Sequence, residues 1–279
     1  MSSPDLSIII PAHQEADRIA ACLAALRNQD PGPGRKVEAI VVANGCTDDT
    51  ASVAQSQIEP WRVRGHVLRV IETPAGGKTK ALNLGEAAAT GRLRLYLDAD
   101  VVAGPGMLAG LIEVLDGPGA RYAGARLRIP RPRSPVSRLY ARFWQKLPFV
   151  AQGVTGAGLF AVNAEGRARW EKFPQVISDD GFARLHFAPH ERRLVEVPYD
   201  WPITDGAVAL VRVRRRQDAG MAELSRLYPA LMANGRGDRP GAFALLRLAA
   251  DDPLGFAAYA GISLAVRLAP RAKGWARGR

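Results

Sequence analysis

Short β-branched runs alternate with segments of helical periodicity over residues 6–97. Residues 6–10 form an apolar run that ends at Pro11, and residues 15–26 then place apolar side chains at helical spacing. Residues 37–42 repeat the strand pattern, and residues 49–54 can form a helix after an Asn44-Gly45 turn. This alternation favours an α/β fold, in which a mostly parallel sheet is covered by helices on both faces.

The same pattern continues into a third and a fourth strand. Residues 67–71 form the third, a Gly76-Gly77 turn follows, and residues 80–89 have the composition of a helix. Residues 93–97 form the fourth and lead directly into Asp98-Ala99-Asp100. Since ligands of such sheets bind beyond the carboxyl ends of the strands, we expect the loops after all four strands to converge on one rim.

The second half of the chain has a weaker pattern. Residues 121–149 are rich in proline and arginine, with a helix expected at 136–146. Residues 153–162 predict a turn and an apolar strand, and helices are expected to dominate beyond residue 216.

Composition narrows the classes of function. The chain has 279 residues and a net charge of +11, which favours acidic partners such as a diphosphate or an anionic lipid. Nucleic acid is not an expected partner, because basic and aromatic residues are not interleaved. Cys22 and Cys46 show no CxxC spacing, and neither a signal peptide nor a run of about 18–20 apolar residues is found. We therefore expect a cytoplasmic protein.

Asp98 and Asp100 form a candidate metal site. One residue separates them at the end of a strand, where the backbone turns, so both can face one loop. Hard carboxylate oxygens so placed suit Mg²⁺ or Mn²⁺ bridging a diphosphate. The alternative is that these acids merely solvate a turn.

Asp179-Asp180 and the segment 156–158 are further candidates. A carboxylate at 179 or 180 can act as a general base, whereas the alternative is a pair of acids at a helix N-terminus. Gly156 and Gly158 can leave room for an acceptor, or simply form a tight turn. Residues 156–161 also match the dinucleotide pattern GxGxxA, but a strand follows these glycines where that pattern needs a helix.

Six ordered motifs together resemble family 2 glycosyltransferases with the GT-A fold, over about residues 5–217. The motifs are Pro11-Ala12-His13-Gln14-Glu15, Asn44-Gly45-Cys46-Thr47-Asp48-Asp49-Thr50, Gly77-Lys78-Thr79-Lys80-Ala81-Leu82-Asn83, Asp98-Ala99-Asp100, Thr155-Gly156-Ala157-Gly158 and Asp179-Asp180. The resemblance implies a Rossmann-like catalytic domain at 1–217 and a helical C-terminal extension at 218–279. It also implies an inverting transfer from a nucleotide sugar, most commonly a UDP-sugar, to a hydroxyl acceptor.

The resemblance also implies roles for individual residues. Asp100 and Asp98 would hold Mn²⁺ or Mg²⁺, Asp180 would be the base, and Asp179 would orient its loop. Gly156, Ala157 and Gly158 would face the acceptor. The implied donor-binding residues are Pro11, Ala12, Glu15, Asn44, Asp48, Lys78, Asp98, Ala99, Arg212, Arg215 and Arg216.

The sequence departs from the family pattern at two places. The basic run at 212–216 lacks the tryptophan that accompanies it in many members, so Arg212, Arg215 and Arg216 all stay candidates for the diphosphate. Asn44 and Cys46 stand where the family has aspartate and serine, which leaves the base of the nucleotide open. These departures favour one alternative, a non-catalytic nucleotide-sugar or lipid-surface binding module. A sugar-nucleotide pyrophosphorylase is disfavoured, because residues 11–18 contain no glycine.

The C-terminal segment has two open interpretations. Residues 243–250 and 253–269 predict helices, and residues 267–279 contain five Lys or Arg and no acid. An apolar helix with a basic end is typical of a peripheral anchor on an anionic inner membrane face, which would suit a lipid-linked acceptor. Alternatively, these helices pack on the catalytic domain and bury Leu254, Phe256, Tyr259 and Leu264.

Overall fold

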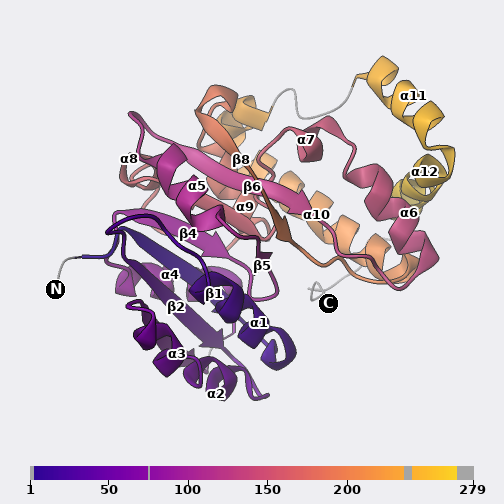
Figure 1. Ribbon diagram of the computed structural model, residues 1–279. Helices are drawn as coiled ribbons and strands as arrows, with labels where there is room; N and C mark the ends of the chain where they lie inside the picture. The colour runs from indigo at the N-terminus through magenta and orange to yellow at the C-terminus, as the bar shows by residue number, and fades with distance from the viewer. Residues whose placement is uncertain (1–2, 75, 236–240, 269–279) are drawn as a thin grey trace.

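The computed structural model describes residues 3–74, 76–235 and 241–268, which form one mixed eight-stranded sheet between helices (Figure 1). The strand order is β3-β2-β1-β4-β7-β6-β8-β5. The strands are β1 (Leu6–Ala12), β2 (Val37–Asn44), β3 (Val67–Thr73), β4 (Leu93–Leu97), β5 (Val102–Ala103), β6 (Tyr122–Arg128), β7 (Leu159–Val162) and β8 (Arg192–Asp200).

The helices complete the layers. They are α1 (Ala16–Arg27), α2 (Thr50–Gln55), α3 (Ile58–Val63), α4 (Lys78–Ala88), α5 (Met107–Leu115), α6 (Pro135–Trp144), α7 (Pro148–Ala151), α8 (Ala164–Arg167), α9 (Asp179–Leu185), α10 (Ala207–Leu227), α11 (Ala242–Asp251) and α12 (Pro253–Leu268), with short 3-10 turns at Pro189–Glu191 and Pro229–Gly235. The expected helix at 80–89 begins earlier, at Lys78, which stands in the first turn of α4.

The N-terminal half of the sheet is the predicted parallel unit. β1 lies between β2 and β4, and β2 pairs with β3, all in parallel. Ile8 and Ile10 belong to a core cluster with residues of α1 and α5, whereas Ile9 belongs to a second cluster with Leu82 of α4. Alternate side chains of β1 therefore enter cores on opposite faces, which confirms a sheet covered on both sides.

The other half of the sheet is mixed. β7 pairs antiparallel with both β4 and β6, whereas β6 and β8 are parallel, with a register shift between Ala125 and Arg126. β6 lies within the segment 121–149, for which only a helix was expected. The fold is thus the predicted α/β class, with an antiparallel strand next to β4.

The C-terminal helices gather beside the end of the sheet that is remote from β3 (Figure 1). Phe143 of α6 contacts Phe256 of α12 at 5.5 Å between ring centroids, and Tyr140 stacks on Tyr259 at 5.7 Å. Helix α10 runs through position 217, so the expected boundary between 217 and 218 falls inside a helix. None of the described helices combines the length and apolar content needed to cross a bilayer.

Candidate active site

The loop after β1 is tied to the loop after β2. Gln14, which has φ +58°, accepts a hydrogen bond from the Thr47 amide at 2.7 Å and donates one to its hydroxyl at 2.8 Å. The Asp48 carboxylate accepts from the amides of Ala16 and Thr50 at 3.2 and 3.1 Å. Asp48 thus holds the starts of α1 and α2 together. Burial by itself would raise the pKa of Asp48, but hydrogen bonds from the Thr50 hydroxyl and from these two amides lower it.

Asn44 connects three loops through its side-chain amide. Its Nδ2 donates to the Ala12 carbonyl at 2.8 Å, and its Oδ1 accepts from the Gly77 amide at 3.0 Å. The side chain of His13 contacts the Asn44 carbonyl at 2.7 Å. An aspartate could not donate to Ala12, so asparagine at this position has a structural reason independent of the nucleotide.

Asp98 and Asp100 lie where β4 ends. The Asp98 amide donates to the Gly158 carbonyl at 2.8 Å, and the Val101 amide donates to the Asp98 carbonyl at 3.1 Å, which closes a turn. The Asp100 residue is 6% exposed, whereas the Asp98 side chain is 32% exposed. Both carboxylates therefore lie just beyond the carboxyl end of β4.

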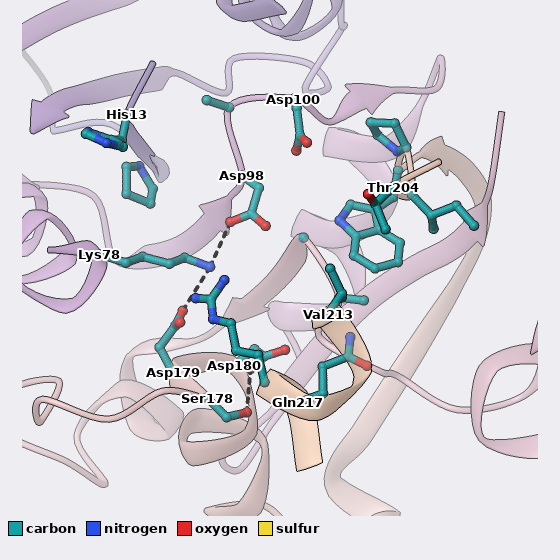
Figure 2. A pocket seen from close by; sticks show the side chains of 18 of the residues that line it. His13, Lys78, Asp98, Asp100, Ser178, Asp179, Asp180, Thr204, Val213 and Gln217 are labelled. Carbon is teal, nitrogen blue, oxygen red and sulfur yellow. Dashed lines mark hydrogen bonds and ion pairs between the residues drawn. The ribbon is translucent and has the colours of Figure 1, made fainter. Parts of the chain in front are cut away.

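Lys78 bridges two carboxylates from different parts of the chain. Its Nζ lies 2.8 Å from Asp98 Oδ1 and 3.2 Å from Asp179 Oδ2 (Figure 2). Burial by itself would lower the pKa of Lys78, but the charges of Asp179 and Asp98 outweigh it and raise that pKa. Lys78 therefore stays cationic and holds β4 and α9 together across the site.

Asp179 and Asp180 occupy the first turn of α9, after Ser178. Burial raises the pKa of Asp179 to about 6, with Lys78 opposing the shift and Asp180 adding to it. Asp180 Oδ1 accepts from the Ser178 hydroxyl and the Gly181 amide, both at 2.8 Å. The carboxylate of Asp180 is thus oriented by its own helix turn, as the alternative of acids at a helix N-terminus also predicted.

A cavity of about 800 Å³ joins these groups at the carboxyl ends of β1, β2 and β4. It confirms that the four loops share one rim. The predicted residues that line it are Pro11, Glu15, Asn44, Lys78, Asp98, Ala99, Asp100, Ala157, Gly158, Asp179, Asp180 and Arg216. Gly156 lines a small adjoining pocket. The structure does not bring Ala12, Asp48, Arg212 or Arg215 to either lining.

Helix α10 contributes one face to the cavity. Leu210, Val213, Arg214 and Gln217 follow the i, i+3, i+4, i+7 spacing of a helix face, and Arg216 lies beside them. Arg214, which also hydrogen-bonds Tyr140, was not among the arginines selected from the sequence. Knowledge of which side of α10 faces the cavity would have identified Arg214. The sequence did not predict that this helix begins at Ala207.

An aromatic wall forms part of the cavity lining. It consists of Tyr140 and Trp144 of α6 and Trp201 after β8. The rings of Trp144 and Trp201 lie 6.0 Å apart between centroids. None of these residues was predicted from the sequence, because their contribution depends on how α6 packs against the end of β8.

Gly156 and Gly158 each leave space that a neighbouring aromatic side chain occupies. Gly158 has φ +70°, and a Cβ there would lie 2.4 Å from Trp201 Cδ1. Gly156 has φ +78°, and its Cβ would meet the Tyr122 hydroxyl oxygen at 2.6 Å. Both positions therefore need glycine, because of their positive φ and the lack of space for a Cβ. The strand β7 that follows excludes the dinucleotide pattern.

The carboxylates suit a divalent cation that takes part of its coordination from a ligand. Among the residues that the structure describes, His, Cys, Asp and Glu form no cluster of three or more that could enclose a metal. Asp98 and Asp100 offer two hard oxygen donors beside an open cavity. Mg²⁺ and Mn²⁺ fit such a site because they accept diphosphate and water oxygens as remaining ligands.

Parts of this chain are similar in sequence to known glycosyltransferases. The AglE glycosyltransferase of Haloferax volcanii is 29% identical over 129 residues, which are 46% of this chain and 41% of that protein. Dolichyl-phosphate beta-glucosyltransferase of Drosophila melanogaster is 38% identical over 104 residues, 35% of this chain and 31% of that protein. The chain thus matches less than half the length of either relative.

A solved structure shows the same fold. The mannosyltransferase PcManGT from Pyrobaculum calidifontis, in complex with GDP-Man and Mn²⁺, superposes with a TM-score of 0.61 at 21% identity, over 97% of this chain and 77% of that one. Residues 7–168, more than half of this chain, match the family model described as glycosyl transferase family 2. The chain therefore belongs to glycosyl transferase family 2.

Proposed function

We propose that this enzyme transfers a sugar from a nucleoside-diphosphate sugar to a hydroxyl acceptor with inversion at the anomeric carbon. The observation that supports it most strongly is the single cavity that joins Asp98 and Asp100 to Asp179 and Asp180. One base suffices for a single displacement, whereas a glycosidase needs a pair of carboxylates with acid and base roles.

The donor would lie across the loops after β1, β2 and β4. Pro11, Glu15 and Asn44 would face the nucleoside, and Asp98 its base or ribose. A UDP-sugar is the proposed donor because it is the commonest in the family that the motifs resemble. GDP-sugars are the natural comparison, because PcManGT was solved with GDP-Man.

The diphosphate would be met by cations. Lys78 stands beside Asp98, and Arg214 and Arg216 reach the cavity from α10. Negative charge builds up on the departing nucleoside diphosphate, so cations placed beforehand stabilise the transition state. Among the arginines predicted from the basic run 212–216, Arg216 is the one that we propose contacts the diphosphate. We add Arg214 as a second contact. Arg212 and Arg215 stay predictions.

Asp100 and Asp98 would hold Mn²⁺ or Mg²⁺. When bound, such an ion neutralises charge on the diphosphate leaving group. These two residues would then position the donor, and Lys78 would keep Asp98 from repelling it.

Asp180 would accept the proton of the acceptor hydroxyl. Ser178 and Gly181 hold its Oδ1, so the carboxylate has a fixed orientation from which to take that proton. Asp179, bound to Lys78, would orient the loop. The acceptor would enter along Ala157 and Gly158, facing the aromatic wall of Tyr140, Trp144 and Trp201. Such a wall suits an acceptor with an apolar part, in line with the predicted lipid-linked acceptor.

The division at 217 and 218 and the cytoplasmic, peripheral localisation stay predictions. The non-catalytic binding module is not favoured, because the family match and the intact Asp100 and Asp180 both point to a transferase.

A calorimetric screen of nucleotide sugars tests the proposal. UDP-glucose, UDP-N-acetylglucosamine and GDP-mannose would be titrated into the full chain with and without Mn²⁺. We expect one nucleotide to bind at least about tenfold more tightly with Mn²⁺, a difference of about 1.4 kcal/mol. Failure of every donor to bind in either condition would contradict the proposal.

A further inference from the structure

Two consecutive helices leave one large apolar face in solvent. Phe243 and Leu246 of α11 are 82% and 69% exposed, and Leu254, Leu264 and Leu268 of α12 are 66%, 56% and 74% exposed. We name these five side chains the α11–α12 face. Single exposed apolar residues are ordinary, but a group of this size on adjoining helices is typical of an interaction surface.

The face has the spacing of one side of a helix. On α12, Leu, Ala or Gly occupies the exposed positions 254, 257, 261, 264 and 268, which recur every three or four residues. Pro253 and Arg267 are the other exposed residues of this helix. On α11, Phe243 and Leu246 are exposed, whereas Leu245 and Leu248 pack against the main core. The apolar stripe is therefore continuous in pattern and separate from the side chains that hold the helices.

The opposite side of α12 is firmly attached to the enzyme. Phe256 and Tyr259 contact the rings of Phe143 and Tyr140 on α6. Asp252, which precedes α12, accepts from Arg142 at 2.8 Å and from the Gly255 amide at 3.0 Å. Of the four residues that the core-packing alternative named, Phe256 and Tyr259 pack, whereas Leu254 and Leu264 do not. The helices are thus docked, and the stripe faces outward.

Charge distinguishes between the possible binding partners of the α11–α12 face. Arg247 and Arg267 are exposed beside it, and residues 269–279, which follow α12 directly, contain four Lys or Arg, one Trp and no acid. A second copy would bring two such basic segments together, which charge repulsion opposes. An anionic lipid surface attracts them, at about 1 kcal/mol for each Lys or Arg near it, and accepts Leu, Phe and Trp at the boundary between headgroups and acyl chains.

We propose that the α11–α12 face docks on an anionic lipid bilayer, with its Leu and Phe side chains inserted shallowly and Arg247 and Arg267 against the headgroups. The helices lie in the plane of the surface and do not cross it, in agreement with their length. Docking needs no donor, so it stands or falls independently of the proposed sugar transfer.

Vesicle flotation of the full chain tests the proposal. Vesicles of phosphatidylcholine alone and vesicles with about one third phosphatidylglycerol would be compared at low and high salt. We expect wild type to float with the anionic vesicles only, and to bind at least about tenfold less at high salt. Equal binding to both vesicle types, or to neither, would overturn the proposal.

Three variants separate the face from general hydrophobicity. Phe243→Ser, Leu254→Ser and Leu264→Ser together should reduce binding at least about tenfold, because apolar insertion is lost. The matched control is Ile58→Ser with Val63→Ser on α3, which are 39% and 72% exposed in wild type and should leave binding unchanged. Arg271→Ser with Lys273→Ser and Arg277→Ser removes charge alone, and provides a second test if the first variant fails to fold by circular dichroism.

Light scattering of the same samples without vesicles identifies a competing occupant. We expect wild type to form no dimer through the α11–α12 face. A wild-type dimer that the triple serine variant converts to a monomer, with no vesicle binding by wild type, would assign the face to a second copy and overturn the proposal.

Discussion

The Lys78 ammonium group lies 2.8 Å from the carboxylate of Asp98 at the end of β4. The same nitrogen lies 3.2 Å from Asp179 on α9, so one side chain joins the parallel half of the sheet to the turn that contains Asp180. Lys78 is therefore a structural link between the two carboxylate pairs. It is also the cation that we propose for the donor diphosphate.

Replacing Lys78 by methionine should weaken donor binding by about tenfold or more, because carboxylates left without their cation repel the diphosphate. Calorimetry with the preferred nucleotide sugar measures this. Lys80→Met is the matched control, since Lys80 is exposed on the same helix and does not line the cavity described above. Equal losses in both variants would show that only the overall charge matters.

Asp180→Asn should lower the transfer rate by about a hundredfold to ten-thousandfold, because the amide keeps the size of the carboxylate but cannot take the proton of the acceptor. Donor affinity should change little. Asp179→Asn is the control, since Asp179 orients the loop through Lys78. Rates and donor affinities of both variants would be compared with wild type, and a rate for Asp180→Asn within a few-fold of wild type would move the base elsewhere.

Gly158→Ala should displace Trp201 from the cavity wall, because the new Cβ would lie 2.4 Å from Trp201 Cδ1. Transfer should fall more than donor binding, since we propose that the acceptor faces this wall. Gly34→Ala controls for backbone strain alone: Gly34 also has φ +70°, with nothing within 4 Å of the new Cβ. If both variants lose the same amount of activity, steric displacement is not the cause.

Much of the first half of the fold follows from its sequence, because local signals there agree with the tertiary structure. β1 and β2 are buried parallel strands and therefore appear as apolar, β-branched runs. β4 is also mostly buried, and its Leu and Tyr residues mark it as an apolar strand. Their ends carry Asn44 and Asp98, so the rim of the cavity could be predicted from strand ends alone.

The second half depends on contacts between distant segments. β6 contains three consecutive small residues at 123–125, followed by Arg126 and Arg128. The partners of these arginines, Glu196 and Asp200, lie on β8. Neither strand is rich in β-branched residues over its full length, so neither stands out in the sequence. The aromatic wall and the choice of Arg214 likewise depend on helix phase and packing.

The attachment of α12 should depend on pH. The hydrogen bond from Arg142 is the main cause that holds the pKa of Asp252 at about 2, below its ordinary value of 3.8. The ionised form therefore stabilises the fold above about pH 4, and this stability is lost as pH falls toward 2. Urea unfolding of Asp252→Asn should show lower stability at pH 7 and a flatter dependence below pH 4. Identical pH curves for both proteins would contradict the assignment.

A metal-assisted donor site is tested most directly by titrating the preferred nucleoside diphosphate into wild type and Asp100→Ala, each with and without Mn²⁺. The Asp100 carboxylate would supply one anionic oxygen ligand to the cation. Without it, the cation would be bound only by the diphosphate, water and Asp98. We predict that Mn²⁺ tightens binding by at least about tenfold in wild type and has no effect in Asp100→Ala. An Mn²⁺ effect of the same size in both proteins would contradict the proposed metal site.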